Sequence, residues 1–364
     1  MIYHFVGDTM KLYEKIYTEL KKRINAGEFA GGKLLPTEKS LQEEFQVSRI
    51  TVKQAYNKLA EEGLITRIAG KGTVLADKSD RHAKAKLIGL VLCDFDATFG
   101  ERLIKSIEEN AQKYGYSVIL KRSLDNHETE SRVLNELMEI GVQGIIIQNC
   151  HGDFTKNLIE LSIYDFPLVS VDRYAKGLLI PYVTSDNFSA CMDATELLLK
   201  KGHRKILLAS ANPKSTSTLT ERAEGFQQAH IRYGTSLSAD NFMIDLKSPI
   251  SRSDADIAAD IAGIQKHMET HQVTAILAAE HFAAELCAEA LKKSEKSFPQ
   301  DCEMICFDCE KSFLPRSDYT HILQNEEEMG KVCVEQLMKK IQKENVTVRS
   351  VIKSELVIGN STNR

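Results

Sequence analysis

The chain has little glycine and proline, 20 and 7 among its 364 residues. That content is too low for low-complexity or disordered proteins, and the 43% of hydrophobic residues provide for at least one large core. No stretch approaches the roughly 18 apolar residues of a membrane-spanning helix. The N-terminal segment also lacks the apolar run of a secretory signal. We therefore expect a cytoplasmic protein of about two to three domains with no membrane partner.

Signs of disulfides, metal and catalysis are also missing. The eight cysteines are scattered through apolar stretches, which is typical of reduced thiols in a large core. Cys302, Cys306 and Cys309 have a spacing that could indicate a metal, but they span a predicted strand whose side chains alternate faces, and no fourth ligand is evident nearby. Neither glycine-rich phosphate motif occurs, and no Ser–His–Asp set is evident. We expect no metal, no cofactor and no catalytic residue, and hence no enzyme.

Charge is divided unevenly along the chain. Residues 1–86 carry a net charge of +5, whereas the remainder carries −9. A small basic module on an acidic body favours a polyanionic partner for the first part. An ordinary fluctuation in composition would look the same, so charge alone decides little.

The basic module has the pattern of three short helices. Apolar residues recur every four positions over Lys11–Asn25, which predicts a helix. A second helix is expected to begin after Thr37, and a third, Arg49–Glu62, after Ser48, because both residues are favourable N-caps.

A hairpin is expected next. The strand-like runs 64–67 and 73–75 flank Gly70-Lys71-Gly72, whose slim tip would carry a cation into a minor groove. Three helices and a hairpin in about 70 residues make a winged helix-turn-helix. Such a module usually binds DNA through its recognition helix; a winged helix used for protein contact is the alternative.

Residues 77–85 are charged, have no apolar periodicity and are interpreted as a linker. From residue 86 onward, strand-like and helix-like runs alternate, which predicts an α/β fold of parallel sheets covered by helices on both faces. Nearly 280 residues exceed one ordinary sheet of this kind, so we expect two lobes. A cleft between them would collect ligands at the carboxyl ends of the strands. Strands are expected at 86–93, 117–121, 144–148, 167–172, 182–185, 205–209, 243–245, 274–277, 303–307 and 321–323, and helices at 99–114, 127–140, 188–201, 221–233, 253–269, 281–292 and 326–342.

Residues 10–76 resemble the GntR family of bacterial regulators. The similarity is carried in order by Leu35-Pro36-Thr37-Glu38-Lys39, Val47-Ser48-Arg49-Ile50-Thr51-Val52-Lys53, Glu62-Gly63-Leu64-Ile65 and Gly70-Lys71-Gly72-Thr73-Val74. It implies that the first motif lies near the DNA backbone, that the second enters the major groove and that Gly70–Gly72 of the fourth motif form the wing tip. Lys53 stands where Arg is usual, which favours phosphate contact over base reading. The expected DNA-binding residues are Thr37, Glu38, Lys39, Ser48, Arg49, Thr51, Lys53, Gly70, Lys71 and Gly72.

Residues 86–364 look like the LacI/GalR effector domain, which is related to periplasmic sugar-binding proteins. Short matches run along the whole segment, among them Gly141-Val142-Gln143-Gly144-Ile145-Ile146, Pro167-Leu168-Val169-Ser170-Val171-Asp172-Arg173, Val183-Thr184-Ser185-Asp186-Asn187 and Arg222-Ala223-Glu224-Gly225-Phe226. A GntR-type winged helix at 10–76, a linker at 77–85 and a LacI/GalR-like effector-binding and dimerisation domain at 86–364 form an arabinose-repressor-like architecture.

This second resemblance also implies the residues of an effector site. Carboxylates and a guanidinium bind sugar hydroxyls, and an aromatic ring covers the apolar face of a pyranose. Thr218 and Arg222 are expected on the loop that enters the helix 221–233. The family pattern has Asn-Asp after two small residues, and this chain has Ala278-Ala279-Glu280-His281 there instead. Glu280 therefore occupies a typical ligand position. The expected effector-binding residues are Asp94, Phe99, Asp172, Thr218, Arg222, Glu280, Asp308 and Gln324, the last on a crossover between the lobes.

The sequence thus predicts a homodimeric transcriptional regulator that binds double-stranded operator DNA. We expect a repressor of carbohydrate-utilisation genes, relieved by a small sugar for which arabinose is the first candidate. The alternatives are a sugar-binding module without DNA regulation, a regulator of a non-sugar metabolite, and a sugar-modifying enzyme, which the lack of catalytic motifs disfavours.

Overall fold

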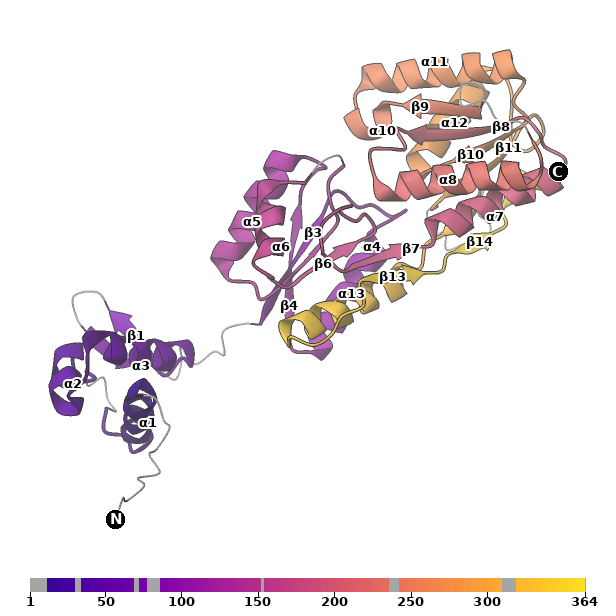
Figure 1. Cartoon of the computed structure of the whole chain (residues 1–364). Coiled ribbons are helices and arrows are strands. Elements are labelled where there is room, and N and C mark those ends of the chain that lie inside the picture. The colour runs from indigo at the N-terminus through magenta and orange to yellow at the C-terminus, as the bar shows by residue number, and fades with distance from the viewer. Residues whose placement is uncertain are drawn as a thin grey trace. The chain divides into compact units, whose positions relative to one another are not determined.

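The computed structural model describes residues 12–29, 34–68, 72–76, 86–151, 154–235, 242–309 and 319–363. It divides the chain into two compact units, Met1–Ala85 and Lys86–Arg364, which are drawn in Figure 1. The linker expected at 77–85 lies outside the described residues.

The N-terminal unit is built as the sequence predicts, from three helices and a hairpin. Thr37 caps the second helix by accepting the Ser40 N–H, and Ser48 caps the third by accepting the Thr51 N–H. The helices bury a small apolar core around Tyr56. The elements are α1 (Leu12–Asn25), α2 (Glu38–Phe45), α3 (Arg49–Glu61) and the antiparallel strands β1 (Ile65–Ile68) and β2 (Gly72–Leu75).

The C-terminal unit contains two six-stranded sheets, one in each of two lobes (Figure 1). The strand order in the first lobe is β13-β7-β6-β5-β3-β4, and every pair in this sheet is parallel. Its elements are β3 (Leu87–Leu92), α4 (Glu101–Lys113), β4 (Ser117–Arg122), α5 (His127–Ile140), β5 (Ile145–Ile147), α6 (Lys156–Ile163), β6 (Leu168–Val171), β7 (Tyr182–Ser185), α13 (Glu326–Ile341) and β13 (Arg349–Ile352).

The second lobe has the strand order β14-β12-β11-β10-β8-β9. The pair β12–β14 is antiparallel, so this sheet is mixed rather than purely parallel as predicted. Its elements are α7 (Asn187–Lys200), β8 (Ile206–Ala211), α8 (Ser217–Arg232), β9 (Met243–Leu246), α10 (Ser248–Ser251), α11 (Asp254–His271), β10 (Ala275–Ala278), α12 (His281–Lys293), β11 (Glu303–Phe307), β12 (Thr320–Leu323), β14 (Glu355–Val357) and the short 3-10 helix Asn360–Thr362.

Helices cover both faces of each sheet (Figure 1). The central strands are continuous apolar runs such as β5, whose three isoleucines are all fully buried. In the first lobe α4 and α13 pack on one face and α5 and α6 on the other; in the second, α7 and α8 lie opposite α11 and α12. No helix of the described segments is long and apolar enough to cross a membrane.

The chain passes between the lobes after β7, after β12 and after β13. Gln324 directly follows β12 and therefore stands on the second of these crossings, as expected. Residues that directly follow strands of both sheets line one cavity, so the carboxyl ends of both sheets face the boundary between the lobes.

Candidate functional site

The exposed start of α3 presents a paired arginine. The Nε of Arg49 lies 3.1 Å from Oε2 of Glu38, and the Arg67 guanidinium lies 3.7 Å from the other carboxylate oxygen. Arg49 is nevertheless 77% exposed. Because an exposed ion pair contributes little free energy, Arg49 can leave Glu38 for a base or a phosphate at small cost.

The other expected DNA-binding residues of α2 and α3 lie beside this pair. Lys39 and Lys53 are exposed, and the described residues offer neither an ion pair. The Thr37 and Ser48 side chains serve as caps, and the Thr51 hydroxyl lies 2.9 Å from that of Ser48. Their positions at the helix starts are therefore fixed by the fold itself.

The wing is described in part. Gly70 and Lys71 lie outside the described residues, whereas Gly72 begins β2 with a φ of +109°. A Cβ at Gly72 would lie 3.2 Å from Cδ2 of Leu34. This backbone conformation and the close neighbour explain why glycine stands at the base of the hairpin tip.

A cavity of about 500 Å³ lies between the lobes of the C-terminal unit, at the carboxyl ends of both sheets. The structure brings together all of the effector residues expected from the sequence. Lining this one cavity are Asp94, Phe99, Asp172, Thr218, Arg222, Glu280, Asp308 and Gln324.

Two aspartates, one from each lobe, have equivalent settings in this cavity. Asp172 follows β6 and Asp308 follows β11, each with a φ of +61° and each 6% exposed. Oδ2 of each accepts a side-chain amide N–H at 2.8 Å, from Gln148 for Asp172 and from Gln324 for Asp308. Oδ1 of each is buried and has no hydrogen-bond partner among the described residues.

The two glutamines are themselves held in place. Oε1 of Gln148 accepts the Cys93 N–H at 3.1 Å, and Oε1 of Gln324 accepts the Ser185 hydroxyl at 2.6 Å. These contacts fix which end of each amide faces its aspartate. Each carboxylate therefore keeps one oxygen available as an acceptor, and a bound hydroxyl group could satisfy it.

Arg222 is a buried cation of the cavity. Its Nε donates to Oδ1 of Asn187 at 2.8 Å and its Nη1 donates to the Ala279 carbonyl at 2.6 Å. The guanidinium carbon stands 3.7 Å from the centre of the Phe307 ring. These contacts hold a buried guanidinium in one orientation.

The expectation that Thr218 and Arg222 lie on a loop is wrong. The helix α8 begins at Ser217, because the Thr216 side chain caps it by accepting the Leu219 N–H. Thr218 and Arg222 lie in its first two turns, so a rigid helix rather than a loop positions them.

Two acidic side chains of the cavity have raised pKa values. Burial raises the pKa of Asp308 to about 7, although Arg222 opposes the shift. Burial also raises the pKa of Glu280, against the attraction of Arg173, Arg222 and Arg252. In the described part of the chain, Oε1 of Glu280 is a third buried oxygen of this cavity with no hydrogen-bond partner.

Asp94 and Phe99 form a more open edge. Asp94 is 65% exposed and pairs with Arg122 at 2.7 Å, and its Oδ1 also accepts the Phe95 N–H. Phe99 is half-buried. The edge therefore offers one aromatic ring and one solvent-exposed charge, in contrast to the buried Asp172 and Asp308.

Several lining residues were not predicted from the sequence. Gln148, Asp125 and Arg173 come from the segments that follow β5, β4 and β6, and Arg252 stacks on Phe282 with its guanidinium carbon 4.0 Å from the ring centre. The sequence pattern that could have identified such residues is a polar residue directly after an apolar strand, as Gln148 is after β5.

A winged helix with an exposed basic start to its third helix, joined to a two-lobed unit with a polar interlobe cavity, defines a ligand-responsive DNA-binding protein. The family model of bacterial regulatory proteins of the gntR family matches residues 12–75. That of periplasmic binding proteins and the sugar binding domain of the LacI family matches residues 85–358. The chain belongs to the latter family and carries a gntR-family N-terminal domain.

Similar proteins share nearly the whole length. The arabinose metabolism transcriptional repressor of Geobacillus stearothermophilus is 24% identical over 97% of this chain and 98% of its own. The ribose operon repressor of Halalkalibacterium halodurans is 28% identical over 87% of this chain and 92% of its own. A LacI-type regulator of Alkaliphilus metalliredigens, solved with D-xylulofuranose, is 25% identical, covers 76% of this chain and 99% of its own, and has a TM-score of 0.62.

Proposed function

We propose that the chain is a transcriptional repressor of carbohydrate-utilisation genes whose operator binding is relieved by a small sugar. The main support is the set of three buried, unpartnered carboxylate oxygens, from Asp172, Asp308 and Glu280, that line one cavity. Sugar hydroxyls are donors, and a cavity of about 500 Å³ has the size of small-molecule sites.

The sugar would bind across the lobe boundary. Asp172 belongs to the first lobe and Asp308, Arg222 and Glu280 to the second, so one ligand that satisfies both aspartates links the two lobes. Binding then favours one arrangement of the lobes over others. Such coupling between effector and operator typically amounts to about 1–3 kcal/mol and is reciprocal.

DNA recognition is assigned to the N-terminal domain. Arg49 and Lys53 at the exposed start of α3 would enter the major groove, with Thr37, Glu38 and Lys39 near the backbone and Gly70, Lys71 and Gly72 at the wing. Operator DNA is usually pseudo-palindromic, which favours a homodimer acting in the cytoplasm. The names of the similar repressors make L-arabinose and D-ribose the first sugars to test.

The test is calorimetric titration of the full chain with L-arabinose, D-ribose and a panel of other pentoses and hexoses. We expect one sugar to bind with one site per chain. Asp172→Asn should weaken that binding by about tenfold or more, because the amide replaces an acceptor with a donor. Asp165→Asn, on the exposed surface of the same lobe, is the matched control. Binding of no sugar, or equal binding by Asp172→Asn, would refute the assignment.

A further inference from the structure

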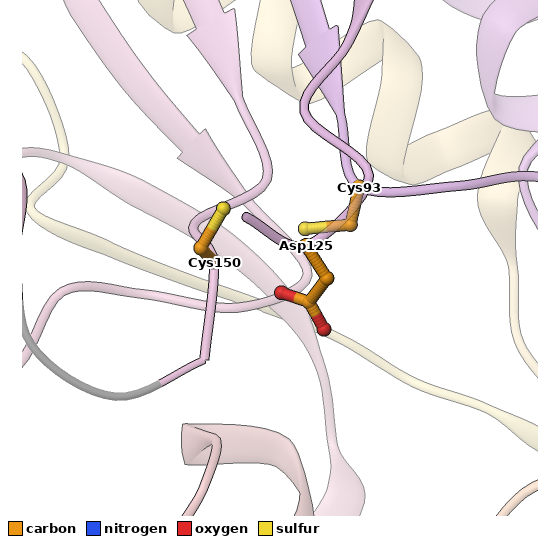
Figure 2. A group of neighbouring side chains, drawn as sticks. All are labelled: Cys93, Asp125 and Cys150. Carbon is orange, nitrogen blue, oxygen red and sulfur yellow. The ribbon is translucent and has the colours of Figure 1, made fainter. Parts of the chain in front are cut away.

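Two buried cysteines lie close together beside the cavity between the lobes, which is called the effector cavity below. Cys93 directly follows β3, and Cys150 follows β5, which is the neighbouring strand. Asp125 comes from the segment after β4, on the other side of β3. The two sulfur atoms and a carboxylate oxygen of Asp125 all lie within 4.8 Å of one another, and Figure 2 shows the three side chains grouped at the strand ends.

A second group of donors shares Cys150. A ring nitrogen of His127 and a carboxylate oxygen of Glu130 lie within 4.8 Å of the Cys150 sulfur and of each other. Glu130 is engaged, since it accepts the Thr155 hydroxyl at 2.8 Å and the Cys150 N–H at 3.2 Å. Nδ1 of His127 is buried and makes no hydrogen bond to any residue that the structure describes. His127 lies beside Cys150 but is not grouped with Cys93 or Asp125. Asp125 is engaged as well, since its Oδ1 accepts the His151 N–H at 2.9 Å and its Oδ2 lies 2.9 Å from Nδ1 of His151. Because its own ring nitrogen makes no hydrogen bond among the described residues, His127 is the candidate for a fourth ligand.

We propose that Cys93, Asp125, His127 and Cys150 form a binding site for a thiophilic divalent metal ion, with Zn²⁺ as the natural occupant. Two thiolates with one imidazole and one carboxylate are ligands that Zn²⁺ accepts, whereas Mg²⁺ and Ca²⁺ prefer oxygen alone. Tetrahedral Zn²⁺ sets its ligand atoms about 3.3–3.8 Å apart. The Cys93, Asp125 and Cys150 ligand atoms lie within 4.8 Å of one another and would have to approach by about 1–1.5 Å, and the His127 ring would have to turn toward them.

The neighbouring cation does not oppose this assignment. Nη1 of Arg173 lies 3.0 Å from Oδ2 of Asp125 and 3.6 Å from the Cys93 sulfur. Binding of Zn²⁺ releases the two thiol protons, so the net charge of the cluster is unchanged. Arg173 then donates to two of the ligands from the outer shell, where such partners orient ligands and strengthen binding.

The site is also accessible. Cys93 and Asp125 line the effector cavity, and Cys150 lines an adjoining cavity of about 390 Å³. An ion can therefore reach the ligands without unfolding of the lobe. Metal binding is independent of the proposed repressor function, because it requires neither a sugar nor DNA.

The test uses the reduced full-length chain, with Co²⁺ as a spectroscopic probe and Zn²⁺ as competitor. We expect one Co²⁺ per chain, a cobalt–thiolate charge-transfer band, and complete displacement by Zn²⁺. Cys93→Ser and Cys150→Ser should each weaken binding by at least about tenfold and reduce the band. Cys333→Ala, a buried cysteine of α13 in the same lobe, is the matched control and should retain both.

His127→Gln provides a variant whose effect does not pass through the buried core, because His127 begins α5. It should weaken Co²⁺ binding by about tenfold or more while the thiolate band remains. Circular dichroism verifies that each variant is folded. Absence of a thiolate band in the wild-type chain, or a band of full strength in folded Cys150→Ser, would overturn the site. Unchanged affinity in His127→Gln would overturn the four-ligand set.

Discussion

Replacing Asp308 by asparagine should make the protein more stable and less able to bind its sugar. Burial raises the pKa of this carboxyl from 3.8 to about 7. Since one pKa unit corresponds to 1.36 kcal/mol, the charged form costs the folded state of the order of 4 kcal/mol. Asparagine has nearly the same shape, and its carbonyl oxygen can still accept the Gln324 amide that Oδ2 accepts at 2.8 Å.

The gain should depend on pH in a defined direction. Below about pH 3.8 the carboxyl is protonated in both the folded and the unfolded chain, so the substitution changes little. Between that value and about pH 7 the unfolded chain ionises and the folded chain does not, so the wild type loses relative stability as the pH rises. Above pH 7 the difference is constant. At pH 5.5 the gain of Asp308→Asn should be about half of its value at pH 8.

Urea denaturation followed by far-UV circular dichroism at pH 5.5 and pH 8 measures this gain, since the chain has no tryptophan. Asp94→Asn is the control, because Asp94 is 65% exposed and should change the free energy of unfolding by less than about 0.5 kcal/mol. Calorimetry on the same samples should show sugar affinity reduced by tenfold or more. A destabilised Asp308→Asn at pH 8, or a gain equal at both pH values, would refute the reasoning.

Three further predictions test separate contacts. Ser48→Ala removes the cap of α3 and should lower the stability of the N-terminal domain by about 1 kcal/mol in thermal unfolding; an unchanged midpoint would show that the cap is not needed. Gly225→Ala places a Cβ 2.2 Å from the Phe188 carbonyl oxygen and should cost about 1–3 kcal/mol, whereas Gly263→Ala, with its nearest neighbour 3.6 Å away, should be neutral or stabilising in the same assay. Arg49→Ala should weaken specific operator binding by about 1–3 kcal/mol in anisotropy titrations; an unaltered preference over random DNA would remove it from the residues that read bases.

Much of this fold follows from local patterns. Buried strands such as β11 are short apolar runs bounded by turn residues, and their expected limits agree closely with the structure. The elements that were not predicted have weaker patterns. The edge strands β13 and β14 contain only exposed and half-buried residues over four and three positions, and α10 is a single turn of four residues. Their formation depends on packing between distant segments, which no local window contains.

The residues of the effector cavity likewise include some that could be predicted from the sequence and some that could not. The eight residues expected from family resemblance all line it, because strand ends in a parallel sheet meet at one edge. The roles of Gln148 and Gln324 could not be predicted, since each depends on a hydrogen bond to a residue far away in the chain. The proximity of Cys93 and Cys150 could not be predicted either. Each was interpreted as an ordinary core thiol, and only the order of the strands brings them together.

The most direct test of the repressor assignment is fluorescence anisotropy of labelled DNA from upstream of the protein's own gene, measured with and without the sugar identified by calorimetry. We predict specific binding that the sugar weakens by about fivefold or more in the wild-type chain and leaves unchanged in Asp172→Asn. Specific binding that the bound sugar does not alter, or strengthens, would contradict the account.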